Sequence, residues 1–158
     1  MKMVIGALVG ATMFCAQAQA ACWSPREVAA AQIRSLDTMM MVSALGCRGW
    51  DRSVAARYNA FVEQNRGTLR EANEVIRGHF AGQFGRVSGE EAYDAYVTQI
   101  ANRFGGGHQG FDCGDFAQVV DDALATNGSF AELTAIADRA RVEPSLDDGV
   151  CDRGGAAW

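Results

Sequence analysis

The sequence lacks the motifs of several enzyme classes. No two cysteines stand in a Cys-x-x-Cys pair, which argues against thiol–disulfide catalysis and against a compact zinc site. No Gly-x-Ser-x-Gly occurs, so the nucleophile elbow of the α/β-hydrolases is missing. Runs that alternate between apolar and polar residues, the pattern of half-buried strands, are essentially absent, and this predicts an all-α chain.

Positive charge is also scarce. Lysine and arginine together number 14 against 19 acidic residues, and the formal net charge is −5. Lys2 is the single lysine, so every other basic residue is an arginine. Because affinity for nucleic acid comes largely from cationic contacts to phosphate, we expect no nucleic-acid partner.

One apolar run opens the chain and no second one follows. It extends from Met3 to Phe14 behind Lys2, about the length of a signal-peptide core and short of the roughly 20 residues that span a bilayer. Ala18-Gln19-Ala20 then offers small residues at a peptidase site. We therefore predict a signal peptide over 1–20, a periplasmic or secreted product, and no transmembrane segment after cleavage. The alternatives are an uncleaved anchor and a lipoprotein acylated at Cys22.

Four cysteines remain once Cys15 is removed with the predicted leader. An even number in an exported chain suggests two disulfides formed in an oxidising compartment. A continuous helix over about 25–45 would hold its two flanking cysteines roughly 30–35 Å apart, too far for a bridge between them. Up-and-down topology favours Cys47–Cys113 with Cys22–Cys151, while Cys22–Cys113 with Cys47–Cys151 stays open.

Helix starts are the clearest positive signal. Ser24-Pro25-Arg26-Glu27 is a capping box with proline at the first helical position, and its Ser-x-x-Glu spacing recurs at Ser88/Glu91 and Ser129/Glu132. Apolar residues spaced by three and four predict helices over about 25–45, 52–84 with a kink or break at Gly67, 89–104, 114–125 and 130–141. We expect a four- to five-helix bundle over 21–141, stapled by two disulfides, and an irregular acidic tail over 142–158 that carries Cys151.

Three segments resemble a family of small exported proteins of alphaproteobacteria. They are "MMMVSALGC" (39–47), "RYNAFV" (57–62) and "AYVTQIAN" (95–102), together with a cysteine after the leader and another in "FDC". The resemblance implies a helical exported protein without an established activity. Some members of that family carry the label S-adenosylhomocysteine hydrolase, which this chain does not support. Its "GGGHQG" at 105–110 follows a predicted helix, whereas the NAD loop of that enzyme lies between strand and helix.

The loop "GGGHQGFDCGD" is the most unusual stretch. His108, Asp112 and Asp115 could gather a metal ion or another ligand, or His108 could act as a general base. The structural alternative is a flexible loop in which Asp112 caps the next helix and Cys113 anchors it. His79, beside Ile76 and Phe80, is expected to be a partly buried or boundary residue. Asp147, Asp148 and Asp152 do not fit an EF-hand loop and suggest a solvated acidic tail.

No coherent catalytic constellation emerges from these residues. A glycoside hydrolase would need two carboxylates across a cleft, and the candidates, Glu63, Glu71, Glu74, Glu90 and Glu91, fall mostly on polar helix faces. The sequence therefore favours a non-catalytic binding or structural accessory of the cell envelope, without a cofactor, whose partner is an envelope protein or a small ligand. The alternative is a small envelope enzyme such as a cell-wall glycoside hydrolase.

Overall fold

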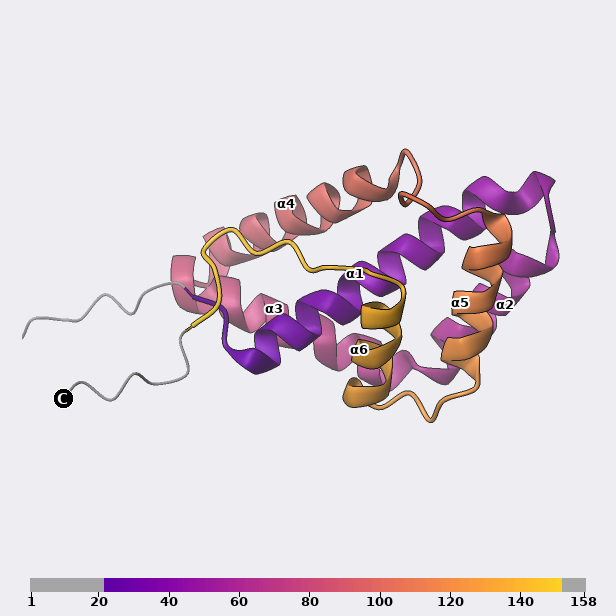
Figure 1. The fold of residues 1–158 in the computed structure, drawn as a ribbon. Helices are drawn as coiled ribbons and strands as arrows, with labels where there is room; N and C mark the ends of the chain where they lie inside the picture. The colour runs from indigo at the N-terminus through magenta and orange to yellow at the C-terminus, as the bar shows by residue number, and fades with distance from the viewer. Residues whose placement is uncertain (1–21, 152–158) are drawn as a thin grey trace, which may run out of the picture.

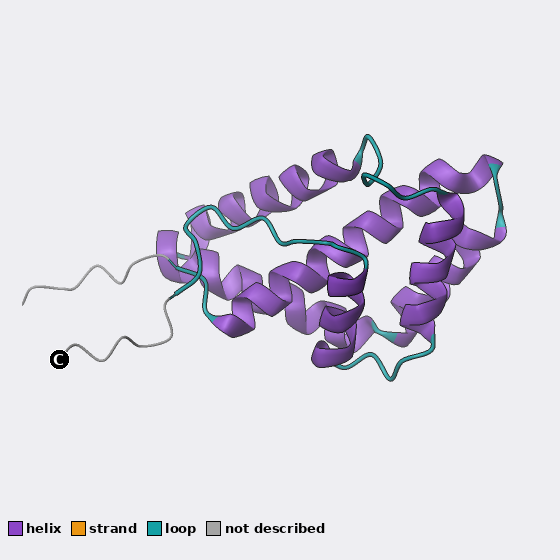
Figure 2. Cartoon of the chain, in the orientation of Figure 1, coloured by secondary structure: helices purple, strands orange, loops and turns teal. Residues whose placement is uncertain are grey.

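The computed structural model describes residues 22–151, and the chain over this range is helical (Figures 1 and 2). In chain order the elements are α1 (Pro25–Gly46), a 3₁₀ turn η1 (Cys47–Gly49), α2 (Ser53–Gln64), α3 (Arg66–Phe84), α4 (Arg86–Phe104), α5 (Cys113–Leu124) and α6 (Phe130–Arg139). The all-α prediction is confirmed. The signal peptide predicted for 1–20, Asp152 and the end of the tail lie outside the described residues.

Helix α1 is the central element of the fold. Its partners are α2, α3, α4, α5 and α6, and it runs diagonally through the middle of Figure 1. Ile33, Leu36, Met39 and Met40 have no exposed surface, and small or polar residues such as Ser35 and Thr38 are buried on its other sides. A helix that is buried on most of its circumference needs neighbours on all sides, and the five other helices supply them.

The segment predicted over 52–84 with a kink or break at Gly67 is two helices, so the described chain has six helices where four to five were expected. The break falls at Asn65 and not at Gly67, which lies inside α3. Asn65 is buried, and its side-chain amide donates to the carbonyl of Phe61 at 2.9 Å. Asparagine competes in this way with the backbone ladder, whereas a glycine only weakens it.

Helix α4 begins three residues before the predicted position. Gly85, with φ of 79°, turns the chain sharply between α3 and α4, and α4 starts at Arg86. Ser88 therefore lies within the helix, and the capping box predicted for Ser88/Glu91 is wrong. The boxes at Ser24/Glu27 and Ser129/Glu132 are both formed. The helix predicted to end at residue 141 stops at Arg139, because Arg141 takes a positive φ of 53°.

Two disulfides close the structure at opposite ends of α1. Cys22 pairs with Cys151 and Cys47 with Cys113, which is the favoured pairing of the two that the sequence left open. Residues 140–151 contain no helix, and in Figure 1 this segment returns from α6 to the end of the molecule where α1 begins. Within 22–151, none of the helices has the length and apolarity required to cross a bilayer.

Candidate functional site

A groove of about 620 Å³ lies where α3, α4 and the C-terminal segment meet the start of α1. Its aromatic lining consists of Trp23, Phe80, Phe84 and Tyr96, and its small residues are Ala92 and Ala95. The polar lining consists of Gln83, Gln99, Asp147 and Asp148. We call this site the Trp23–Tyr96 groove. Its volume falls within the range of small-molecule sites, which are also mostly apolar with a few placed polar groups.

Trp23 is fixed at the floor of the groove by backbone as well as by packing. Its N–H donates to the carbonyl of Gly149 at 2.9 Å, and its carbonyl accepts from the N–H of Cys151 at 3.0 Å. These bonds form a single parallel β-bridge with Val150, directly beside the Cys22–Cys151 disulfide. The bridge and the disulfide together hold the C-terminal segment, with Asp147 and Asp148, at the edge of the groove.

Three buried polar atoms of the groove residues have no protein partner. Trp23 is 1% exposed and Tyr96 is 4% exposed, yet neither the indole N–H of Trp23 nor the hydroxyl of Tyr96 makes a hydrogen bond. The side-chain oxygen of Gln83 is also buried and unpaired, while its amide nitrogen donates to Asp148 at 2.9 Å. An unpaired buried polar group costs on the order of 1–3 kcal/mol, so three of them in one small region call for an explanation.

The aromatic side chains of the groove form one connected cluster. The Trp23 ring lies 5.7 Å from the rings of both Phe80 and Tyr96, and Phe80 lies 6.4 Å from Phe84. Phe84 is 51% exposed, so the cluster extends from the core to the surface. Burial raises the pKa of the Tyr96 hydroxyl well above its usual value, and the group therefore stays protonated and able to donate.

His79 supports the floor of the groove from behind. Its ring stacks on Trp23 with a centroid distance of 3.9 Å, and its Nδ1 lies 3.3 Å from Oε1 of Glu27. The residue is buried, which corrects the expected boundary position: α1 and the tryptophan cover the helix face that carries it. The other ring nitrogen, Nε2, is buried without a partner.

The loop singled out in the sequence lies at a different place. His108 lines a second groove of about 460 Å³ with Arg103, Phe104, Arg141 and Glu143. Its Nε2 lies 2.9 Å from the carbonyl oxygen of Ala140, which connects the loop to the end of α6. Arg103 donates to the carbonyl of Glu143 at 2.6 Å and to Ser145 at 3.2 Å. Two polar side chains of this second groove, those of Arg103 and His108, are thus bonded to the segment that follows α6.

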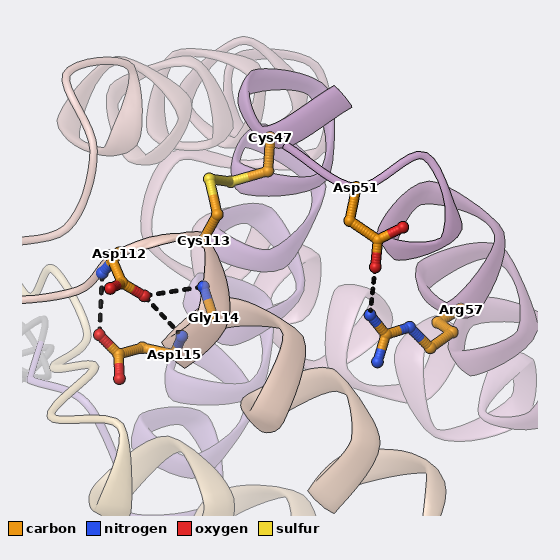
Figure 3. The surroundings of a disulfide bond; sticks show 7 residues. All are labelled: Cys47, Asp51, Arg57, Asp112, Cys113, Gly114 and Asp115. Atoms are coloured by element: carbon orange, nitrogen blue, oxygen red, sulfur yellow. Dashed lines mark hydrogen bonds and ion pairs between the residues drawn. A yellow bond between two sulfur atoms is a disulfide. The ribbon is translucent and has the colours of Figure 1, made fainter. Parts of the chain in front are cut away.

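Asp112 and Asp115 are brought together, but in a capping box at the start of α5 (Figure 3). Asp112 accepts from the N–H groups of Gly114 and Asp115, and Asp115 accepts from the N–H of Asp112 at 2.8 Å. Among residues 22–151, no three His, Cys, Asp or Glu side chains are placed to hold a metal ion together. This arrangement matches the structural role that the sequence offered as an alternative to a metal site: Asp112 caps α5, and Cys113 anchors the helix through its disulfide with Cys47.

The same disulfide lies close to an ion-pair network. Figure 3 shows Asp51 beside Arg57, and the two side chains are 3.3 Å apart. Arg57 also contacts Asp121 of α5 at 2.6 Å, so one arginine joins α2 to α5. These groups connect helices and contribute to neither groove.

The carboxyl group whose pKa is raised lies elsewhere in the core. Burial raises the pKa of Asp37, which accepts from Arg34 at 2.8 Å and from the Tyr58 hydroxyl at 2.9 Å. A glycoside hydrolase places an acid of raised pKa in its substrate cleft. Asp37 lines neither groove described above. Glu63, Glu71 and Glu90 form exposed ion pairs with Arg66, Arg26 and Arg77.

The chain matches no protein-family model, no curated protein and no solved structure. Membership of the alphaproteobacterial family therefore stays a prediction. Sequence reasoning did not identify the Trp23–Tyr96 groove, because its residues come from four separated segments. The one local signal was Trp23 itself, a large aromatic residue between a disulfide cysteine and a helix cap.

Proposed function

We propose that the protein is an exported, non-catalytic binding protein of the cell envelope, and that its ligand is a small molecule bound in the Trp23–Tyr96 groove. The observation that carries the proposal is the pair of unpaired polar groups on Trp23 and Tyr96, two side chains that are otherwise almost fully buried. Both atoms are buried in the free protein, so a ligand bonds to them when the side chains around the groove shift. These bonds remove the cost of leaving the two groups unpaired and thereby favour the bound state.

Export is supported by the sequence and by the disulfides. Lys2 and the apolar run after it have the form of a signal peptide, and two disulfides persist best in an oxidising compartment. A binding role is favoured over hydrolysis by the position of Asp37, since the acid of raised pKa is bonded to Arg34 and Tyr58 rather than facing a groove.

A groove-filling substitution tests the proposal. Ala95 is exposed and lines the groove, so Ala95→Trp would occupy the space that a ligand needs. Ala135 is an exposed alanine on α6 outside the groove, and Ala135→Trp is its matched control. Oxidised protein would be isolated from the periplasm and studied by native mass spectrometry and by ligand-observed NMR with a library of small polar and aromatic compounds.

We expect bound molecules with the natural chain and with Ala135→Trp, and loss of those molecules with Ala95→Trp. Equal binding by the two tryptophan variants would overturn the proposal, because the ligands would then occupy another place. A natural chain that binds no library member and carries no small molecule out of the periplasm would overturn it as well.

A further inference from the structure

We infer that the Trp23–Tyr96 groove selects a small organic ammonium compound that also carries an oxygen acceptor. This inference rests on the proposed function and specifies the chemistry of its ligand. It follows from the charge, the ring surfaces and the unpaired polar atoms of the groove, which are three separate observations.

The charge at the edge of the groove is negative. Asp147 and Asp148 are both exposed and both line it, and among the described lining residues none is basic. Arg34 and Arg103 are engaged elsewhere: Arg34 pairs with Asp37, and Arg103 donates to Glu143 and Ser145. The two carboxylates therefore attract a cation that enters the groove, and they repel an anion.

The walls of the groove suit a cation as well. Trp23, Phe80, Phe84 and Tyr96 place four aromatic rings in one cluster, and the half-exposed Phe84 offers its ring at the surface. The negative face of an aromatic ring attracts an ammonium group, and cages of such rings recognise quaternary ammonium ligands. The same attraction occurs within this protein, where the guanidinium of Arg77 lies 4.5 Å above the ring of Tyr93.

The unpaired polar atoms define the rest of the ligand. The indole N–H of Trp23 is buried and can only donate, so a ligand that pairs with it must supply an acceptor. The Gln83 side-chain oxygen can only accept, and the Tyr96 hydroxyl can do both. A hydroxyl or carbonyl oxygen a few bonds from the ammonium group would meet these requirements, while the cation itself lies among the rings and carboxylates.

Choline and 3,3-dimethylbutan-1-ol separate charge from shape. The alcohol has the same outline and the same hydroxyl as choline, but a neutral carbon replaces the ammonium nitrogen. Titration of the oxidised protein, followed by NMR or calorimetry, should show choline binding at least about tenfold more tightly than the alcohol, with an affinity that falls as salt rises. Equal affinity for the two compounds, or no binding of choline, would overturn the inference.

Variants assign the effect to the groove. The double change Asp147→Asn with Asp148→Asn should weaken choline binding about fivefold or more, and Phe84→Leu by about two- to fivefold. The matched control for charge is Glu63→Gln with Glu74→Gln, two exposed acids outside the groove, and it should leave the affinity unchanged. Equal losses from the two double variants would overturn the inference, since only net charge would then matter.

The experiments distinguish a failure of this inference from a failure of the proposed function. If neutral library compounds bind and are lost in Ala95→Trp while choline does not bind, the groove is a ligand site but not an ammonium site. If no compound, choline included, responds to Ala95→Trp, both are overturned.

Discussion

Nδ1 of His79 and Oε1 of Glu27 lie 3.3 Å apart, and this pair joins the first turn of α1 to a buried residue in the C-terminal half of α3. Glu27 uses its other carboxylate oxygen to accept from the N–H of Ser24 at 2.6 Å, so one side chain both caps a helix and holds an imidazole. Because His79 stacks on Trp23, the pair also supports the floor of the groove. A helix cap and the floor of the Trp23–Tyr96 groove thus depend on the same carboxylate.

Replacing Glu27 by Gln should separate these two roles. Glutamine can complete a capping box, but it has no charge for His79. We expect the free energy of unfolding to fall by about 1–2 kcal/mol near neutral pH. Burial acts to raise the pKa of Glu27, but the bonds with Ser24 and the charge of His79 outweigh it, and the pKa lies below its ordinary 4.5. The carboxylate therefore stabilises the fold above pH 4.5, and the difference between the natural chain and Glu27→Gln should shrink as the pH falls below that value.

Glu132→Gln is the matched control for that measurement. Glu132 closes the capping box of α6 with Ser129, and its bonds to Ser129 likewise lower its pKa, but no histidine contacts it. Urea unfolding of both variants across acidic pH would show the larger effect at Glu27. Equal effects at the two positions would mean that the contact with His79 contributes nothing.

Asp37→Asn should show the opposite dependence on pH. Burial raises the pKa of Asp37 above its ordinary 3.8, despite the contacts with Arg34 and Tyr58, so the folded protein binds this proton more tightly than the unfolded chain does. Stability from this group is full below pH 3.8 and falls as the pH rises through the folded-state pKa. The advantage of the natural chain over Asp37→Asn should therefore decrease as the pH rises from 3.8, when urea midpoints are compared. Tyr58→Phe keeps the carboxyl but removes a bond that lowers its pKa, so its stability should still fall with rising pH and the fall should extend to higher pH. If Asp37→Asn showed the same pH dependence as the natural chain, the assignment to Asp37 would be contradicted.

The two disulfides should have similar effects on stability and different effects on binding. They close loops with sequence separations of 129 for Cys22–Cys151 and 66 for Cys47–Cys113, which correspond to about 5 and about 4 kcal/mol in the chain-entropy model. Double serine variants of each pair, compared by thermal unfolding, should both be strongly destabilised. Only Cys22→Ser with Cys151→Ser releases the segment that carries Asp147 and Asp148. Under conditions where both double variants remain folded, only this one should therefore lose affinity for choline. Equal loss of affinity in both would contradict this role of the bridge.

Gly89→Ala should destabilise the packing of α3 against α4. A Cβ at Gly89 would lie 2.8 Å from backbone atoms of Ala81, so the helices would have to separate, at a cost of about 1–3 kcal/mol. Gly82→Ala is the control, because a Cβ there meets nothing within 4 Å and α3 should gain about 0.5–1 kcal/mol. Thermal unfolding of the two variants should thus move in opposite directions. A neutral Gly89→Ala would show that the two helices can separate without cost.

The parts of the fold that the sequence predicted are those set by local chemistry. The boxes at Ser24/Glu27 and Ser129/Glu132 formed because a serine oxygen and a glutamate three residues later satisfy the same free N–H groups in any context. The length of α1 excludes a Cys22–Cys47 bridge, and the favoured one of the two remaining pairings was confirmed because up-and-down topology brings Cys113 back to the end of α1 that carries Cys47. The spacing at Ser88/Glu91 failed because the glycine turn at Gly85 had already started the helix.

Sequence patterns could not predict the Trp23–Tyr96 groove. Trp23, Phe84, Tyr96 and Asp148 lie in different segments, and nothing in their local spacing shows that they meet. Composition drew attention to His108 instead, because a histidine in a glycine-rich loop is conspicuous. Its ring contacts the end of α6, and the nearby aspartates cap α5. Which buried polar groups remain unpaired is a tertiary property, and here that property identified the groove.

The bridge between Trp23 and Val150 also bears on the order in which the chain can fold. Trp23 is among the first described residues to be synthesised, and its backbone partners Gly149 and Cys151 are among the last. The backbone of Trp23 must therefore stay without these partners until the chain has been made as far as Cys151, since contacts that are distant in sequence close late. Helices α1 to α6 can form and begin to pack before that moment, but the groove gains its acidic edge only in the final step. Completion of the groove thus requires a chain that has been made at least as far as Cys151.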